Sequence, residues 1–172
     1  MPSLMLSREF TMKMVQDFKD LLSALNAHHV EYLVIGGYAF GAYSEPRATK
    51  DIDIFIRADA QNSLAVFNAL ADFGAPLAGF QPSDFNDEAG SVFQIGVPPN
   101  RIDILQKITA VSFDEAWETR VETIVDGEIL VPVISSDLLI RNKLAVGRPR
   151  DLLDVADIRE AALERPDGES SK

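Results

Sequence analysis

Apolar residues recur along the chain with two different spacings, and each spacing predicts one kind of element. Over residues 11–29 they recur at every third or fourth position, which predicts an amphipathic helix. The run Tyr32–Ile35 is short, continuous and followed by two glycines, so it predicts a buried strand. Residues 51–56 alternate between polar and apolar side chains, as a strand with one covered face does.

The remaining pattern predicts a brief helix, a longer helix, two pairs of strands and two final helices. The first two helices are expected at residues 38–43 and at 60–73, the second with Leu64, Phe67 and Leu70 on one face and Gly74 as the stop. The strand pairs are expected at 91–97 with 101–105, and at 121–125 with 128–134 around Asp126-Gly127. The final helices are expected from Ser136 or Asp137 to 146, with Gly147 as the stop, and at 151–163. Residues 82–90 predict a loop. We therefore expect an α/β (α+β) fold: a mixed β-sheet flanked by helices, with a C-terminal helical pair. One domain is expected over residues 1–164, followed by a flexible tail at 165–172.

The amino-acid composition of the chain excludes or disfavours several classes of function. The chain has no cysteine, which excludes disulfides, thiolate metal sites and a cysteine nucleophile. Its 27 acidic and 16 basic residues give a net charge of -11, which disfavours a general nucleic-acid binder. No apolar run approaches the ~20 residues of a membrane span, and the first residues do not resemble a signal peptide. The expectation is a soluble, cytoplasmic protein without a membrane partner.

Three aspartates are the candidate metal ligands. Asp51 and Asp53 are two residues apart on a predicted strand and therefore lie on one face. Two carboxylates this close repel each other, so the pair implies either a bound cation or a shared proton. Asp103 lies in a second strand with the same alternation, and a neighbouring strand could bring it to the pair. Three carboxylates could then hold two Mg²⁺ ions for a phosphoryl transfer.

Gly36-Gly37 is the candidate phosphate site. The two glycines end a predicted strand and open a short helix, so their backbone N–H groups can approach an anion without an intervening Cβ. Neither of the common glycine-rich phosphate motifs, G-x-x-x-x-G-K-S/T and G-x-G-x-x-G, occurs in the chain.

Together, Gly36-Gly37, Asp51-Ile52-Asp53-Ile54 and the later Asp103 resemble the polymerase-beta-type nucleotidyltransferase superfamily. Two longer patterns are similar to its AbiEii-like branch of abortive-infection and toxin–antitoxin proteins: R-x-T-x-D-I-D from Arg47 to Asp53, and K-x-x-x-G-R-x-R-D-x-x-D from Lys143 to Asp154. The resemblance covers roughly residues 30–160. Two positions depart from the commonest pattern: Lys50 precedes Asp51, and Gly37 stands where many relatives carry Ser.

The resemblance implies in-line transfer of a nucleoside monophosphate from an NTP to a hydroxyl acceptor, with release of pyrophosphate and two Mg²⁺ ions as cofactors. Asp51 and Asp53 would be catalytic metal ligands, and Asp103 a third ligand or the base that deprotonates the acceptor. Gly36, Gly37, Arg47, Thr49 and Lys143 would bind the nucleotide. The acceptor would be a tRNA, a protein or a small molecule, and the protein could be a toxin with a cognate antitoxin.

Other interpretations of the same residues stay open. The aspartates could line the solvent face of an edge strand, and Lys143 could be the cation of a helix C-terminus. Arg148 and Arg150 could belong to a solvated turn, and Asp151 and Asp154 to the first turn of the last helix. Rival functions are adenylylation of an aminoglycoside, which predicts an acidic acceptor pocket, and a non-catalytic module that binds a nucleotide or a partner protein. A large RNA acceptor would require Arg47, Lys50, Arg101 and Lys143 to meet in one groove.

Overall fold

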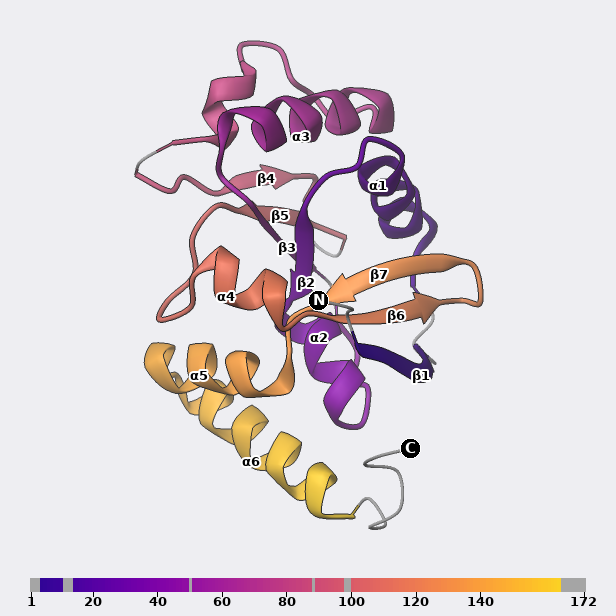
Figure 1. Cartoon of the computed structure of the whole chain (residues 1–172), viewed down its shortest axis with the longest axis vertical. Helices are drawn as coiled ribbons and strands as arrows, with labels where there is room; N and C mark the ends of the chain where they lie inside the picture. The colour runs from indigo at the N-terminus through magenta and orange to yellow at the C-terminus, as the bar shows by residue number, and fades with distance from the viewer. Residues whose placement is uncertain (1–3, 11–13, 50, 88, 98–99, 165–172) are drawn as a thin grey trace.

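The computed structural model describes residues 4–10, 14–49, 51–87, 89–97 and 100–164. In this part of the chain, strands form one mixed sheet in the order β1-β6-β7-β2-β3-β5-β4 (Figure 1). Their bounds are β1 Leu4–Phe10, β2 Tyr32–Ile35, β3 Ile52–Ile56, β4 Phe93–Ile95, β5 Ile102–Leu105, β6 Val121–Val125 and β7 Ile129–Val133. The pairs β1·β6, β7·β2 and β3·β5 are parallel, and the other neighbours are antiparallel. The predicted mixed sheet flanked by helices is confirmed.

Helices lie on two sides of the strands. Their bounds are α1 Gln16–Ala27, α2 Gly36–Tyr43, α3 Ala60–Phe73, α4 Phe113–Glu118, α5 Ser136–Val146 and α6 Pro149–Glu164, with a 3-10 helix, η1, at Pro82–Phe85. Figure 1 shows α1 and α3 above the strands and α2, α5 and α6 below them. The helices α5 and α6 pack on each other and both contact α2, which forms the predicted C-terminal helical pair. None of the described helices is long and apolar enough to cross a membrane.

The chain turns where its sequence supplies the required backbone geometry. Asp59 caps α3 by accepting a hydrogen bond from the Asn62 backbone N–H, and Gly74 ends it in the left-handed region at φ 94°. Asp126 and Gly127 both have positive φ, 50° and 72°, which is the geometry of the tight hairpin turn that their sequence predicts. The predicted stops at Gly74 and Gly147 and the hairpin are therefore confirmed.

Several boundaries differ from the prediction. The strand β1, the short helix α4 and η1 were not expected. The first helix begins at Gln16; Val15 is its N-cap and is 37% exposed. Leu64 was wrongly placed on the buried face of α3, since it is 51% exposed while Val66 is buried. The buried face of α3 also carries Asn62 and Ser63, and these polar residues conceal that face from a pattern of apolar positions.

The last two helices also begin elsewhere than predicted. The N-cap of α5 is Ser135 and not the predicted Ser136 or Asp137. The Ser135 hydroxyl accepts a hydrogen bond from the Leu138 backbone N–H. Helix α6 begins at Pro149, a residue favoured at the first helical position, before the predicted start at Asp151. Residues 11–13, Lys50 and the tail at 165–172 lie outside the described residues.

Candidate active site

The parallel pair β3·β5 brings the strand aspartates together. Asp53 and Asp103 are direct partners in the register of these strands. Asp51 lies one residue before β3, and its Oδ1 accepts a hydrogen bond of 3.3 Å from the Arg101 backbone N–H. All three carboxylates line one cavity of about 800 Å³. The structure therefore unites the three predicted aspartates, although they come from segments about 50 residues apart.

The ionised form of Asp53 is disfavoured, because burial and like charges act on it in the same direction. Burial, the charge of Asp103 and a hydrogen bond with it, and the charge of Asp51 together raise the pKa of Asp53 to about 6. The nearby Arg101 opposes it by attraction. Any cation that reaches Asp53 would stabilise its ionised form.

Arg101 contacts the aspartates, although the sequence predicted it only as a contact for an RNA acceptor. Its Nε and Nη2 bind the two oxygens of Asp103 at 2.9 and 3.1 Å, and Nη2 also lies 3.4 Å from Asp51 Oδ2. The signal was present in the sequence, since Arg101 and Asp103 are two residues apart and therefore share one face of their strand. One guanidinium thus holds two of the three carboxylates.

The donor chemistry of this cluster suits a hard divalent cation, because every candidate ligand is a carboxylate oxygen. The arrangement itself is not closed around an ion: among the described residues, no three His, Cys, Asp or Glu side chains form a group that could hold a metal. Arg101 supplies positive charge to Asp51 and Asp103 in this state. Because Arg101 binds both oxygens of Asp103, a cation at Asp103 would have to displace this guanidinium.

The glycines allow the first strand and helix to approach the aspartates. Gly36 has φ 66°, and a Cβ added there would overlap Asp53 Oδ2. A Cβ on Gly37 would lie 2.8 Å from Thr49 Cγ2 and 3.2 Å from Thr49 Oγ1. Glycine at both positions therefore lets the N-terminal end of α2 lie against Asp53 and Thr49. Thr49 in turn donates to the Arg47 carbonyl oxygen at 3.1 Å.

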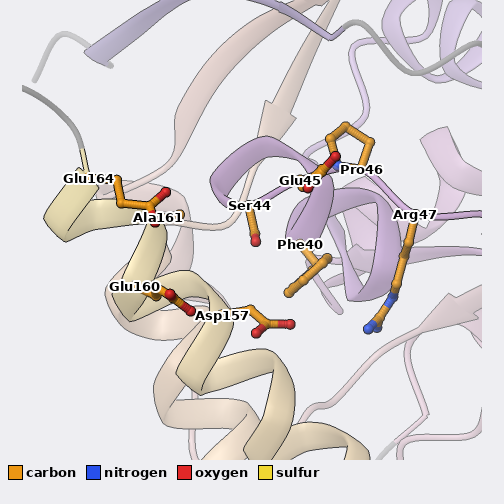
Figure 2. A pocket seen from close by; sticks show the side chains of 9 residues that line it. All are labelled: Phe40, Ser44, Glu45, Pro46, Arg47, Asp157, Glu160, Ala161 and Glu164. Atoms are coloured by element: carbon orange, nitrogen blue, oxygen red, sulfur yellow. The ribbon is translucent and has the colours of Figure 1, made fainter.

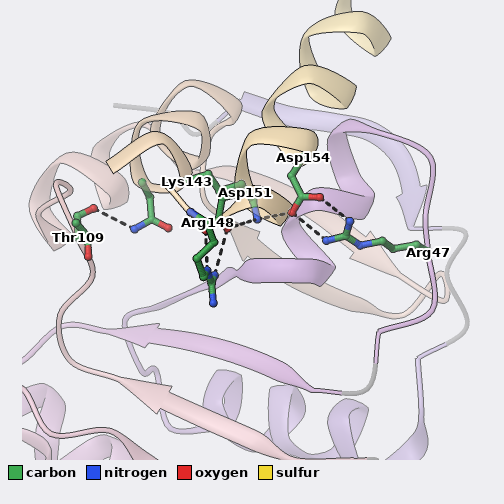
Figure 3. Close-up of polar contacts among 7 residues, drawn as sticks. Arg47, Thr109, Lys143, Arg148, Asp151 and Asp154 are labelled. Atoms are coloured by element: carbon green, nitrogen blue, oxygen red, sulfur yellow. Dashed lines mark hydrogen bonds and ion pairs between the residues drawn. The ribbon is translucent and has the colours of Figure 1, made fainter. Parts of the chain in front are cut away.

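Asp154 of α6 is the centre of a buried charge network (Figure 3). Arg47 binds both of its oxygens, at 2.5 and 2.9 Å, and Lys143 Nζ lies 2.8 Å from Oδ2. Burial disfavours its ionised form, but the hydrogen bonds from Arg47 and Lys143 hold the pKa of Asp154 below its usual range. The network joins the segment after α2 to both C-terminal helices.

A second carboxylate extends this network. Asp151 accepts from Arg148 Nε at 2.7 Å and Nη2 at 3.2 Å, and it lies 3.7 Å from Lys143 Nζ. These hydrogen bonds, with the charge of Arg148, lower the pKa of Asp151. Asp151 and Asp154 are therefore buried partners of these cations, and Asp151 also lies in the first turn of α6.

Every residue predicted for the site lines the same cavity: Gly36, Gly37, Arg47, Thr49, Asp51, Asp53, Asp103 and Lys143. Lys143 is buried against Asp154, so its ammonium serves the network in this state. The cavity wall also contains Asn142, which donates to the Thr109 carbonyl oxygen at 3.0 Å. Nothing in the sequence singled out Asn142, since a lone amide on a helix carries no pattern.

A smaller cavity of about 540 Å³ lies between α2 and α6 (Figure 2). Four carboxylates line it: Glu45, Asp157, Glu160 and Glu164. Figure 2 shows Asp157 and Ser44 facing the space between the two helices, with Phe40 and Arg47 at one side. Arg47 lines both cavities, so they meet at this residue.

The comparisons with known proteins agree on the fold. No curated protein sequence matches the chain significantly. A crystal structure of a candidate nucleotidyltransferase from Thermotoga maritima superposes with a TM-score of 0.55 at 16% identity, covering 88% of this chain and 97% of that one. The solution structure of the antibiotic-resistance factor ANT(2'')-Ia superposes with a TM-score of 0.51 at 14% identity, covering 86% of this chain and 81% of that one. A family model matches residues 11–165, most of the chain, and the protein therefore belongs to the family described as "Nucleotidyltransferase of unknown function (DUF6036)".

Proposed function

We propose that the protein is a Mg²⁺-dependent enzyme that transfers a nucleoside monophosphate from an NTP to a hydroxyl acceptor and releases pyrophosphate. The observation that carries this proposal is the pairing of Asp53 with Asp103 on adjacent parallel strands, against the glycine that opens α2. Carboxylates beside a helix N-terminus provide both halves of a donor site: ligands for a cation and backbone N–H groups for phosphate.

In this proposal Asp51, Asp53 and Asp103 hold two Mg²⁺ ions, and Asp103 is also the candidate base for the acceptor hydroxyl. Bound Mg²⁺ would neutralise the charge of the triphosphate and orient it for in-line attack. Gly36 and Gly37 present backbone N–H groups to the phosphates. The pKa of Asp53 is raised first by burial and then by repulsion from Asp103 and Asp51, and a cation would relieve that repulsion, which supports the metal assignment.

The proposed nucleotide contacts Arg47, Thr49 and Lys143 surround the same cavity. Arg47 and Lys143 are held by Asp154, which fixes their positions before any ligand arrives. Thr49 lies against Gly37, so a hydroxyl is present near the position where many related sequences carry Ser. These contacts support binding of an NTP without specifying its base.

The test is transfer of label from each of four α-labelled NTPs to total tRNA, to protein and to a panel of small hydroxyl compounds. We expect Mg²⁺-dependent labelling and release of pyrophosphate. An Asp51→Asn/Asp53→Asn double variant should reduce labelling to background, whereas Asp17→Asn, an exposed aspartate on α1, should leave it unchanged. Undiminished labelling by the double variant would refute the proposal.

The same assay separates the enzyme from a non-catalytic module on this fold. A binding module would take up nucleotide with no need for Mg²⁺ and would release no pyrophosphate. Calorimetric titration of NTP in EDTA and in Mg²⁺, beside a pyrophosphate assay, distinguishes the two functions.

A small cationic acceptor is the second candidate, and the acidic cavity favours it. Glu45, Asp157, Glu160 and Glu164 place negative charge beside the proposed donor site, with Arg47 common to both cavities. A volume of about 540 Å³ suits a small molecule. The fold is shared with an antibiotic-resistance factor. An aminoglycoside panel tests this candidate, and transfer to tRNA with no transfer to any aminoglycoside would exclude it.

A tRNA acceptor and a toxin role remain part of the proposal through the motif resemblance. Arg47, Arg101 and Lys143 line one cavity, as an RNA acceptor would require, but each is paired with a carboxylate; Lys50 lies outside the described residues. If the protein is a toxin, expression should arrest growth, and a small neighbouring reading frame should restore it as antitoxin. Arrest that persists in the Asp51→Asn/Asp53→Asn variant would exclude a toxin that acts by nucleotidyl transfer.

A further inference from the structure

Arg148 lies at the junction of α5 and α6, where its backbone is fixed on both sides. Gly147 ends α5 at φ 73°, and Pro149 opens α6. The Arg148 backbone N–H donates to Asp151 Oδ2 at 3.2 Å, and its carbonyl oxygen accepts from the Leu152 backbone N–H at 3.1 Å. Arg148 therefore occupies the capping position of α6 and cannot shift without disturbing the first helical turn.

Its side chain is fixed at one edge and open at the other. Nε and Nη2 of the guanidinium bind the buried carboxylate of Asp151, whereas the Arg148 side chain as a whole is 72% exposed. Among the described residues, no hydrogen bond is recorded for its Nη1. Figure 3 shows the side chain extending from the helix junction toward the strands. A guanidinium held in this way is oriented in advance for a second anion.

The Arg148 side chain is more exposed than the other paired cations of the cavity. The side chains of Arg47, Arg101 and Lys143 are 32%, 31% and 9% exposed. Each is directed to carboxylates of the site or of the buried network. The electrostatic field of Asp53 also reaches Arg148: its pKa is raised first by Asp151, with a smaller contribution from Asp53. Arg148 lines the same cavity as the proposed metal ligands Asp51, Asp53 and Asp103.

We propose that Arg148 is a polyphosphate-binding residue, held in place by Asp151 as its positioning residue, and that it contacts the phosphates of the nucleotide in the cavity. The inference rests on the proposed nucleotidyltransferase function and deepens it. Arg148 would add its Nη1 as a charged donor to the contact proposed for Lys143, while Nε and Nη2 stay bound to Asp151.

The test measures binding of inorganic tripolyphosphate in excess Mg²⁺ by calorimetry, because this probe has no base, no sugar and no turnover. Arg148→Gln should weaken binding about tenfold to hundredfold, as loss of a charge-assisted hydrogen bond does. The affinity of Arg148→Lys for tripolyphosphate should lie between those of the wild type and Arg148→Gln. Asp151→Asn should also weaken binding, and adding it to Arg148→Gln should cause little further loss because both act through one side chain. Melting temperatures measured in parallel exclude unfolding as the cause.

Two arginines provide matched controls. Arg150 lines the same cavity without a recorded carboxylate partner among the described residues, and Arg159 is exposed on α6 outside it. Arg150→Gln should have a smaller effect than Arg148→Gln, and Arg159→Gln should change binding less than about twofold.

Equal losses in Arg148→Gln and Arg150→Gln would overturn the inference, since they would indicate general attraction to positive charge. Unchanged binding by Arg148→Gln, or no binding by the wild-type protein, would also overturn it. Failure of the proposed function would look different: tripolyphosphate would still bind through Arg148, but none of the NTPs would label an acceptor.

Discussion

Asp53 is a partly buried carboxyl group whose ionisation is opposed by desolvation, by Asp103 and by Asp51. In the metal-free protein its proton is therefore bound more tightly in the folded chain than in the unfolded chain. The stability that this proton contributes is complete below the unfolded pKa near 4, and it is lost as the pH rises through about 6. At neutral pH, the folded protein holds a repulsive cluster that a cation would relieve.

Replacement of Asp53 by Asn should remove this pH dependence. Relative to the variant, the free energy of unfolding of the wild type should fall by up to about 3 kcal/mol between pH 4 and pH 7. Urea unfolding in EDTA across this range measures the difference. Mg²⁺ at pH 7 should stabilise the wild type more than the variant. If the free energies of unfolding of the two proteins changed equally with pH, the pKa of Asp53 would not be raised by folding. Asp20→Asn on α1 is the control.

Thr49 and Gly37 lie so close that substitution of one depends on the other. Gly37→Ser should destabilise the protein by about 1–3 kcal/mol, because its Cβ would lie 2.8 Å from Thr49 Cγ2. The double variant Gly37→Ser/Thr49→Ala should recover most of that loss, since alanine removes both contacting atoms. Thermal unfolding of the single and double variants measures the coupling. If the two substitutions were additive, Thr49 would not be the obstacle at position 37.

At the scale of elements, the charge network makes α5, α6 and the segment before β3 one unit. Arg47 reaches Asp154 across 107 positions of sequence, while Lys143 and Asp151 connect the two helices. Because Asp154 is almost wholly buried, its two cations compensate for the loss of its hydration. The helices thus determine where Arg47 lies in the cavity.

Asp154→Asn should therefore be strongly destabilising, by about 3 kcal/mol, because it leaves Arg47 and Lys143 without their shared negative charge. Chemical unfolding gives this value. Asp157→Asn, one turn further along α6 and exposed, should change stability by less than about 0.5 kcal/mol. If both substitutions changed stability by a similar small amount, the charge network would contribute little to the free energy of unfolding.

Some elements and site residues could be predicted from the sequence because their signals are local. The alternation around Asp51 and Asp53, the hairpin at Asp126-Gly127 and the stop at Gly74 need only neighbouring residues. The strand β1 lacked such a signal: its partner is β6, more than 100 residues later, and strand pairing at that distance leaves no local pattern. Resemblance led to Arg47, Lys143 and the motif that ends at Asp154, but the pairing of Asp154 with both cations emerged only from the packing of α6.

At the scale of the whole molecule, two cavities of different charge lie side by side. The larger holds cations and carboxylates in pairs, and the smaller is lined by four acidic residues and Arg47. Arg47 separates them, and its guanidinium packs over the Phe40 ring at 4.4 Å from the ring centroid. A phosphate-rich donor and a cationic acceptor would each find a suitable surface.

Loss of two acidic charges should therefore affect the acceptor and not the donor. For a cationic acceptor, Asp157→Asn/Glu160→Gln should raise KM about threefold to tenfold, as removal of two exposed charge contacts does, and leave KM for the NTP unchanged. Wild-type KM for the acceptor should rise with salt for the same reason. Steady-state kinetics with each substrate varied in turn checks this. Glu122→Gln, on β6, is the control, and equal changes in both KM values would contradict the assignment.

The long separation between Arg47 and Asp154 also has a consequence for synthesis. A ribosome delivers the strands, Gly36-Gly37 and all three site aspartates before it delivers Asp154. Until α6 emerges, Arg47 and Lys143 lack this anchor, so we expect the nascent chain to bind nucleotide poorly even after its sheet has formed. The chain would bind nucleotide well only after α6 has emerged from the ribosome.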